Sequence, residues 1–93
     1  MTTEDPDIRL RRLRMRSSRR GIKEMDLILG AFAAGPLTTL EDEELAAYEL
    51  MLSENDQDLY RWVSGQEDPP ARFAPLIDRI RAEIVAAQGV ARP

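Results

Sequence analysis

The chain has 93 residues, enough for one small domain, and its 43% hydrophobic and 32% charged residues are typical of a folded globular protein rather than a disordered segment. It contains no cysteine and no histidine, which excludes disulfides, thiol nucleophiles, cysteine-based zinc sites and the most common general base. The net charge is −4, yet residues 9–23 carry eight Arg and Lys side chains and no acid, so the charge is strongly asymmetric.

The first helix is predicted over residues 6–17. Asp5 followed by Pro6 matches an N-cap acid and a proline at the first helical position. Only a few apolar side chains follow, so this helix is expected to depend on its neighbours. They are Ile8, Leu10, Leu13 and Met15.

A second helix is predicted over about residues 20–34, with Ser17 or Ser18 as its cap and Gly35-Pro36 as its end. Apolar side chains recur every three or four residues, which turns one helix face inward. The set is Ile22, Met25, Ile28 or Leu29, and Phe32.

A third helix is predicted to follow a capping box at residues 39–42 (Thr-Leu-Glu-Asp) and to end near Leu52. Acidic residues 41–44 favour a solvated helix start, where the dipole stabilises negative charge. The inward stripe is Leu45, Tyr48 and Leu52, with Met51 beside it. Tyr48 and Tyr60 are expected at the rim of the core, because a tyrosine hydroxyl favours contact with water.

Two further helices are predicted, over about residues 56–64 and 71–88. Trp62 is expected in the core of the shorter one, while Asp56 and Asp58 are expected to cap or flank it rather than bind metal. Pro75 fits the longer one only within its first turn. Its apolar set has the most regular period in the chain: Phe73, Leu76, Ile77, Ile80, Ile84 and Ala87. No alternating β-strand pattern occurs, so the fold class is all-α.

The expected architecture is one compact helical domain over residues 1–93, a small bundle of about five helices. Its core is expected over about residues 6–88, with short flexible termini. No apolar run approaches the roughly 18–20 residues of a membrane span, so membrane insertion is not expected. The acidic, polar start indicates no signal peptide, and the expected location is the cytoplasm.

Residues 20–24 (Arg-Gly-Ile-Lys-Glu) form the most informative segment. Gly21 stands where the second helix should begin, which indicates close approach of another backbone or a bend between two helices. Arg20 and Glu24 are four residues apart and are expected on one helix face. The residues alone leave two interpretations open: a partner-binding surface, or an exposed ion pair beside a glycine at a helix junction.

Three segments of the chain resemble one protein family. Residues 19–27 (Arg-Arg-Gly-Ile-Lys-Glu-Met-Asp-Leu) are similar to the Arg-Gly-x-x-Glu signature of the SdhE-type succinate dehydrogenase FAD assembly factors. Residues 39–44 resemble the family's acidic start of the third helix, and residues 55–63 resemble its Asp-x-Asp-Leu-(Phe/Tyr)-x-Trp segment. The order and spacing agree over about residues 9–85.

The resemblance implies a non-catalytic chaperone that binds the flavoprotein subunit of succinate dehydrogenase, and in some bacteria that of fumarate reductase. It would promote covalent attachment of FAD to a histidine of that client. The implied client-binding residues are Arg20, Gly21 and Glu24, with Arg19 and Asp26 as neighbours in the contact. No catalytic residue, no metal site and no cofactor of its own are implied, since FAD belongs to the client. A monomer that contacts no nucleic acid is expected.

The residue types of this motif suit such a task. Gly21 would let the two backbones approach, Arg20 would bind a carboxylate or carbonyl group of the client, and Glu24 would accept hydrogen bonds or orient Arg20. This hypothesis requires all three residues at the surface. It also predicts that Gly21→Arg abolishes client binding while the fold remains intact.

The main alternative is a small nucleic-acid-binding, toxin–antitoxin or adaptor protein that uses the Arg-rich segment 9–23. Eight cations can meet phosphates, but the rest of the chain is acidic and no aromatic residues are interleaved for base stacking. A stand-alone enzyme is disfavoured, because the chain has no histidine, no cysteine and no glycine-rich phosphate loop.

Overall fold

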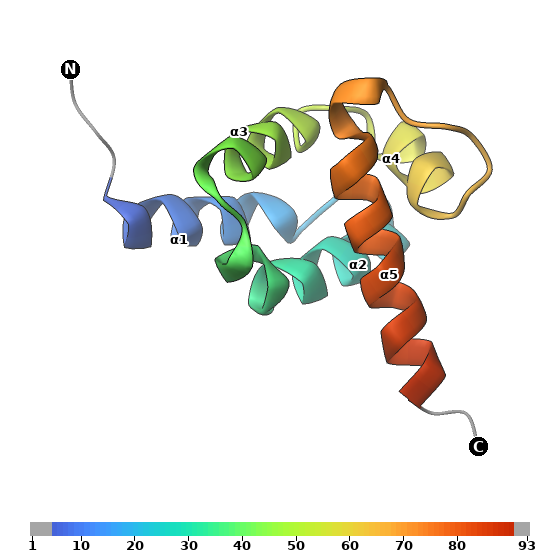
Figure 1. The fold of residues 1–93 in the computed structure, drawn as a ribbon, viewed down its shortest axis with the longest axis horizontal. Coiled ribbons are helices and arrows are strands. Elements are labelled where there is room, and N and C mark those ends of the chain that lie inside the picture. Colours follow the sequence, from blue (N-terminus) through green and yellow to red (C-terminus); the bar gives the residue numbers. More distant parts are fainter. Residues whose placement is uncertain (1–4, 91–93) are drawn as a thin grey trace.

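The computed structural model describes residues 5–90, with the backbone alone described for residues 87–90. Five α-helices and two short 3₁₀ helices make up this part of the chain (Figure 1). The α-helices are α1 (Pro6–Ser17), α2 (Lys23–Ala34), α3 (Asp42–Met51), α4 (Asp56–Val63) and α5 (Ala74–Val90), and the 3₁₀ helices are η1 (Pro36–Thr39) and η2 (Ala71–Phe73). The predicted all-α bundle is confirmed, while the predicted flexible termini and the side chain of Ala87 lie outside the described residues.

Helix α2 holds the bundle together. It runs antiparallel to α1, and α5 crosses it (Figure 1). It also contacts α4. The loop of residues 18–22, which precedes α2, therefore lies close to the start of α4. The helices of residues 5–90 include none that is long and apolar enough to cross a membrane.

The start of α1 lies where the sequence predicts it, whereas the capping box of α3 does not. The Asp5 side chain accepts a hydrogen bond from the Asp7 amide (2.8 Å), with Pro6 as first helical residue, so the predicted start of α1 is confirmed. The capping box of α3 lies two residues later than predicted: the Glu44 carboxylate accepts from the Glu41 amide (2.9 Å). Thr39 does not cap α3, because Pro36 starts a 3₁₀ turn and the Thr39 hydroxyl donates to the Pro36 carbonyl (2.6 Å).

The last helix also begins later than predicted. Residues 71–73 form η2, and α5 starts only at Ala74. Pro75 therefore lies in the first turn of α5, as its missing amide requires. Trp62, on α4, packs against Phe73 with ring centroids 6.0 Å apart and is buried, which confirms its predicted core position.

The hydrophobic core forms from one face of each helix. The predicted stripes of α2, α3 and α5 are confirmed for the described side chains, with Leu29 rather than Ile28 fully buried on α2 and with Ile22 and Ile84 partly buried. Helix α1 contributes Leu13 as its only fully buried apolar side chain, as its thin apolar set predicted. The core residues are Leu13, Met25, Leu29, Phe32, Ala33, Leu37, Leu40, Leu45, Tyr48, Met51, Leu52, Leu59, Trp62, Val63, Phe73, Leu76, Ile77 and Ile80.

Tyr48 was predicted at the rim, and this is wrong: its side chain is fully buried and stacks on Phe32. The buried Ser17 explains why a tyrosine is tolerated there. Ser17 has one hydroxyl proton and donates it to the Leu13 carbonyl (2.7 Å), so the Tyr48 hydroxyl must be the donor in the 2.6 Å contact with Ser17. The predicted cap of α2 by Ser17 or Ser18 is wrong, because Ile22 precedes the first residue of α2 and both serine hydroxyls donate back into α1, to the carbonyls of Leu13 and Met15.

Replacing Tyr48 by phenylalanine is expected to lower the free energy of unfolding near neutral pH by about 1 kcal/mol. Burial raises the pKa of Tyr48, while the hydrogen bond with Ser17 and the charge of Arg20 lower it to a lesser extent. An unfolded chain ionises tyrosine at about pH 10, before the folded protein does, so the wild type should lose stability as the pH rises above this value. Urea unfolding at about pH 7 and about pH 10.5 measures both effects. Equal alkaline losses in wild type and Tyr48→Phe would contradict the burial of this hydroxyl.

Candidate partner-binding surface

The loop of residues 18–22 joins α1 to α2 and carries most of the predicted site. Arg19 adopts a left-handed backbone conformation (φ 58°), which turns the chain out of α1. The Asp26 carboxylate, on the first turns of α2, accepts from the amides of Arg19 (2.5 Å) and Arg20 (3.4 Å). The backbone of Ile22 is extended (φ −114°, ψ 128°), so α2 begins at Lys23 rather than at the predicted residue 20.

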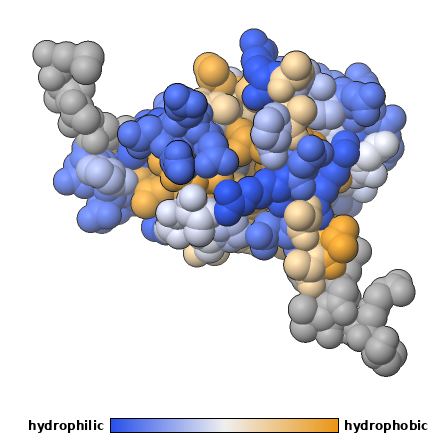
Figure 2. All heavy atoms as spheres, in the orientation of Figure 1, coloured by the Kyte–Doolittle hydropathy of each residue, from blue (hydrophilic) through white to orange (hydrophobic). Residues whose placement is uncertain are grey.

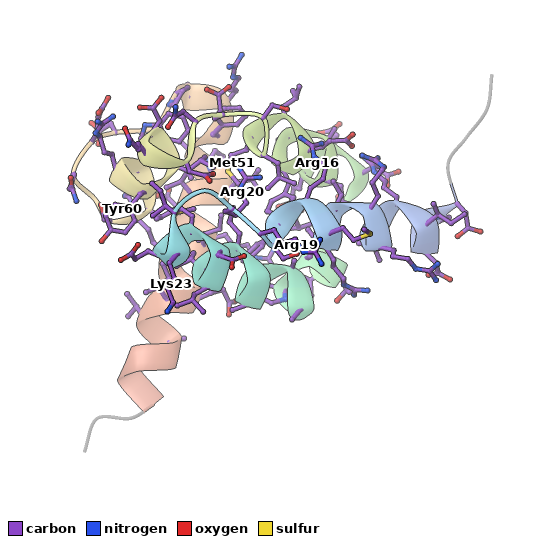
Figure 3. The ribbon with its side chains drawn as sticks, turned by 180° about the vertical axis from the view of Figure 1, so that it is seen from behind. Arg16, Arg19, Arg20, Lys23, Met51 and Tyr60 are labelled. Carbon is purple, nitrogen blue, oxygen red and sulfur yellow. The ribbon has the colours of Figure 1, made fainter. Side chains whose placement is uncertain are left out.

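The Arg20 guanidinium lies beneath this loop, at the junction of α3 and α4 (Figure 3). Its Nε and Nη2 donate to Asp56 Oδ1 (2.9 and 2.6 Å), Nη2 also donates to the Leu52 carbonyl (3.0 Å), and Nη1 donates to the Arg16 carbonyl (2.9 Å). Four of its five N–H donors are thus used within the chain. The side chains of Arg20 and Asp56 are 12% and 15% exposed, so this is a largely buried ion pair.

Gly21 lies against the same carboxylate. Its amide donates to Asp56 Oδ2 (2.6 Å), so both oxygens of Asp56 hold the loop. A Cβ at this position would come within 3.3 Å of Asp56 Oδ2, tighter than an ordinary contact. The predicted bend between two helices is confirmed, and the group in close approach to Gly21 within the chain is the Asp56 carboxylate. The other side of Gly21 is exposed to solvent.

Three charged side chains point away from this network. Arg19, Lys23 and Glu24 are exposed, and within residues 5–90 their side chains make no hydrogen bond or ion pair. Figure 3 shows Lys23 on the outer side of α2, whereas Arg20 points inward. The predicted pairing of Arg20 with Glu24 on one helix face is wrong, because Arg20 precedes the helix and pairs with Asp56.

The five residues predicted from the sequence therefore have two different positions. Gly21 and Glu24 lie at the surface, as the hypothesis requires, and Arg19 is exposed beside them. The expected surface position of Arg20 is wrong, because its guanidinium is 12% exposed and pairs with Asp56. The Asp26 carboxylate likewise holds the loop in place. The sequence analysis missed the role of Asp56, which it expected only to cap or flank α4; Asn55 caps that helix instead, accepting from the Gln57 amide (2.8 Å). No local pattern links Asp56 to Arg20, 36 residues earlier.

The Arg-rich block is also largely engaged within the chain. The contacts are Arg9–Asp42 (3.9 Å), Arg12–Glu49 (2.8 Å), Arg16–Glu49 (3.9 Å), Arg20–Asp56 (2.6 Å) and Arg14 to the Ala33 carbonyl (3.0 Å). The hydrogen bond from Arg12 holds the pKa of the Glu49 carboxyl below its usual value, which partial burial opposes and the neighbouring Arg charges reinforce. Nucleic-acid phosphates would have to compete with these acids for the same cations.

Comparison with known proteins gives one consistent family. Residues 11–84 match the family model described as flavinator of succinate dehydrogenase. The chain is 35% identical over 82 residues to the mitochondrial succinate dehydrogenase assembly factor 2 of Cryptococcus neoformans (86% of this chain, 47% of the relative). It is 36% identical over 63 residues to the FAD assembly factor SdhE of Legionella pneumophila strain Lens (68% of this chain, 80% of the relative).

A third relative is the mitochondrial succinate dehydrogenase assembly factor 2 of Saccharomyces cerevisiae, 43% identical over 78 residues (84% of this chain, 46% of the relative). The chain thus spans about half the length of these fungal relatives and most of the bacterial one. None of these similarities supports the nucleic-acid-binding, toxin–antitoxin or adaptor alternative. The matched region includes the loop of residues 18–22, its Asp56 anchor and the core around them, and the chain accordingly belongs to the succinate dehydrogenase flavinator family, the SdhE-type assembly factors for FAD attachment.

Proposed function

We propose that this protein is a non-catalytic chaperone that binds the immature flavoprotein subunit of succinate dehydrogenase and promotes covalent attachment of FAD to it. The observation that carries the proposal is the exposed face formed by Gly21, on a loop that Arg20 and Asp56 hold in one conformation, and by Glu24, in the first turn of α2. A surface fixed before binding loses little conformational entropy when it meets a partner.

The chemistry of this surface fits selective binding better than catalysis. Glu24 offers an unpaired carboxylate to hydrogen-bond donors of the client, Arg19 and Lys23 offer cations, and Gly21 lets the client backbone approach. A helper that binds the flavinylation-competent conformation of its client more tightly than other conformations raises the population of that state. Every 1.4 kcal/mol of differential affinity shifts the equilibrium about tenfold, with no nucleophile or base supplied by the helper.

Four narrower features complete the proposal. The protein acts as a monomer, which sedimentation of the pure protein tests. It holds no FAD of its own, since the sequence has no dinucleotide-binding fingerprint. A titration of the pure protein with FAD tests this. The flavoprotein of fumarate reductase is a second client. The protein works in the cytoplasm. Several relatives are named as mitochondrial, so cell fractionation is needed to test this location.

The test is deletion of the gene followed by in-gel fluorescence of covalently bound flavin. The band at the size of the succinate dehydrogenase flavoprotein should fade in the deletion strain and return when the wild-type gene is supplied. Immunoblotting of the same subunit shows whether flavin attachment, rather than subunit abundance, has changed. An unchanged flavin band in the deletion strain would contradict the proposed function.

A further inference from the structure

A groove of about 340 Å³ opens between α2 and α5, beside the loop surface but separate from it. Its lining includes Leu27, Ile28 and Ala31 on α2 and Ile80, Glu83 and Ile84 on α5. Apolar side chains also reach the surface along the lower half of α5 in the view of Figure 2. Leu27 is 65% exposed, a large apolar side chain left in contact with water at the edge of a hollow.

This groove continues the surface that carries Glu24. Leu27, Ile28 and Ala31 follow Glu24 by three, four and seven residues, so all four lie along one side of α2. A partner bound over Glu24 would therefore reach the groove within one helical turn, about 5.4 Å along α2. Continuity of this kind favours the same partner for both surfaces.

The charges around the groove limit what it can bind. Glu83 lines it and Glu24 lies at its end, and in the part of the chain that the structure describes neither carboxylate has an ion pair or hydrogen bond. An anionic ligand such as the pyrophosphate of FAD would be repelled by these two acids. The volume lies at the low end of the roughly 300–1,000 Å³ of small-molecule pockets, enough for a few apolar side chains.

We propose that this groove receives an apolar segment of the immature flavoprotein subunit, flanked by a Lys or Arg that pairs with Glu83. Apolar side chains of the segment bury Leu27 and Ile28, in the manner of a helix or strand docked between two helices. The inference rests on the proposed function, and it adds a second contact area to the Gly21–Glu24 surface. It predicts that binding depends on residues that lie outside the Arg-Gly-x-x-Glu motif.

Affinity for the purified flavoprotein subunit that lacks covalent FAD tests this inference. Leu27→Gln should weaken binding about tenfold or more, because docking would then bury an amide in place of an apolar side chain. Leu50→Gln is the matched control: Leu50 is 60% exposed, also on a helix, and lies on α3 away from the groove. Its affinity should equal that of the wild type. Glu83→Gln should weaken binding several-fold, more at low than at high salt.

The outcomes separate the groove from the proposed function. If wild type and Leu50→Gln bind and Leu27→Gln binds equally well, the groove proposal is overturned while the function stands. If the wild type does not bind the subunit at all, the function itself fails. Sedimentation of the pure protein tests whether a second copy of the chain fills the groove instead. If the wild type is a dimer and Leu27→Gln is a monomer, the groove binds a second copy and the proposal is overturned. Unchanged binding by Glu83→Gln would overturn the pairing with a basic residue.

Discussion

Replacing Asp56 by alanine is expected to lower the free energy of unfolding by about 3 kcal/mol. The substitution leaves the Arg20 guanidinium, 12% exposed, without its carboxylate, and removal of one partner from a buried ion pair typically costs about 3–5 kcal/mol. It also removes the acceptor of the Gly21 amide. For a domain of this size, each kcal/mol lowers the melting temperature by about 4–8 °C. Urea and thermal unfolding both measure the loss.

Asp58→Ala is the matched control for this substitution. Asp58 pairs with Arg61 on the same short helix at a similar distance (2.8 Å), but both side chains are about half exposed (45% and 46%). Exposed pairs contribute about 0–1 kcal/mol, so Asp58→Ala should change stability little. Equal losses for Asp56→Ala and Asp58→Ala would show that the Arg20–Asp56 pair has no special role in the fold.

Gly21→Arg is expected to weaken binding to the flavoprotein subunit at least about 100-fold, or roughly 2.7 kcal/mol, while the protein remains folded. A long cation on the exposed face of Gly21 would occupy the space that the client needs. The fold should survive, because the new Cβ meets only one side-chain oxygen, Asp56 Oδ2, at 3.3 Å and displaces it by a few tenths of an ångström. Titration calorimetry gives the affinity and circular dichroism the helix content.

Ala46→Arg provides the control for the added charge. Ala46 is exposed on α3, on the side of that helix opposite its buried stripe, and lies away from the loop of residues 18–22. Its affinity for the client should match that of the wild type. If Gly21→Arg binds as tightly as Ala46→Arg, the client does not use the face of Gly21.

Periodic features of this fold could be predicted from the sequence, because they depend on neighbours three or four residues apart. The stripes of α2 and α5 were of this kind. The start of α1 could be predicted from two adjacent residues, the cap Asp5 and the first helical residue Pro6. The start of α2 could not be predicted in this way. Arg19 has a left-handed backbone and Ile22 an extended one, and Asp26 fixes this non-helical loop by accepting from the amides of Arg19 and Arg20. Local propensity contains no information on these loop contacts.

The candidate site also has features that could be predicted from the sequence and features that depend on residues far away in the chain. The exposure of Gly21 and Glu24 was expected from the family resemblance, which implies that both residues bind a client, and the structure shows both exposed. The inward direction of Arg20 depends on Asp56, 36 residues later, and on the Leu52 carbonyl, which is free to accept only because α3 ends there. Tyr48 was misplaced for a related reason: its hydroxyl is buried because Ser17, 31 residues earlier, accepts its proton.

We propose separate roles within the Arg-Gly-x-x-Glu motif: Arg20 stabilises the loop from within through Asp56, and Glu24 binds the client. The affinity of Glu24→Gln for the flavoprotein subunit without covalent FAD tests this division most directly, because the substitution preserves the shape of the side chain, removes its charge and replaces one acceptor oxygen by a donor amide. Hydrogen bonds to charged groups are worth about 1.5–3 kcal/mol, so affinity should fall about 10–100-fold while the urea unfolding curve stays unchanged. Wild-type affinity in Glu24→Gln, or a loss of stability equal to that of Asp56→Ala, would contradict it.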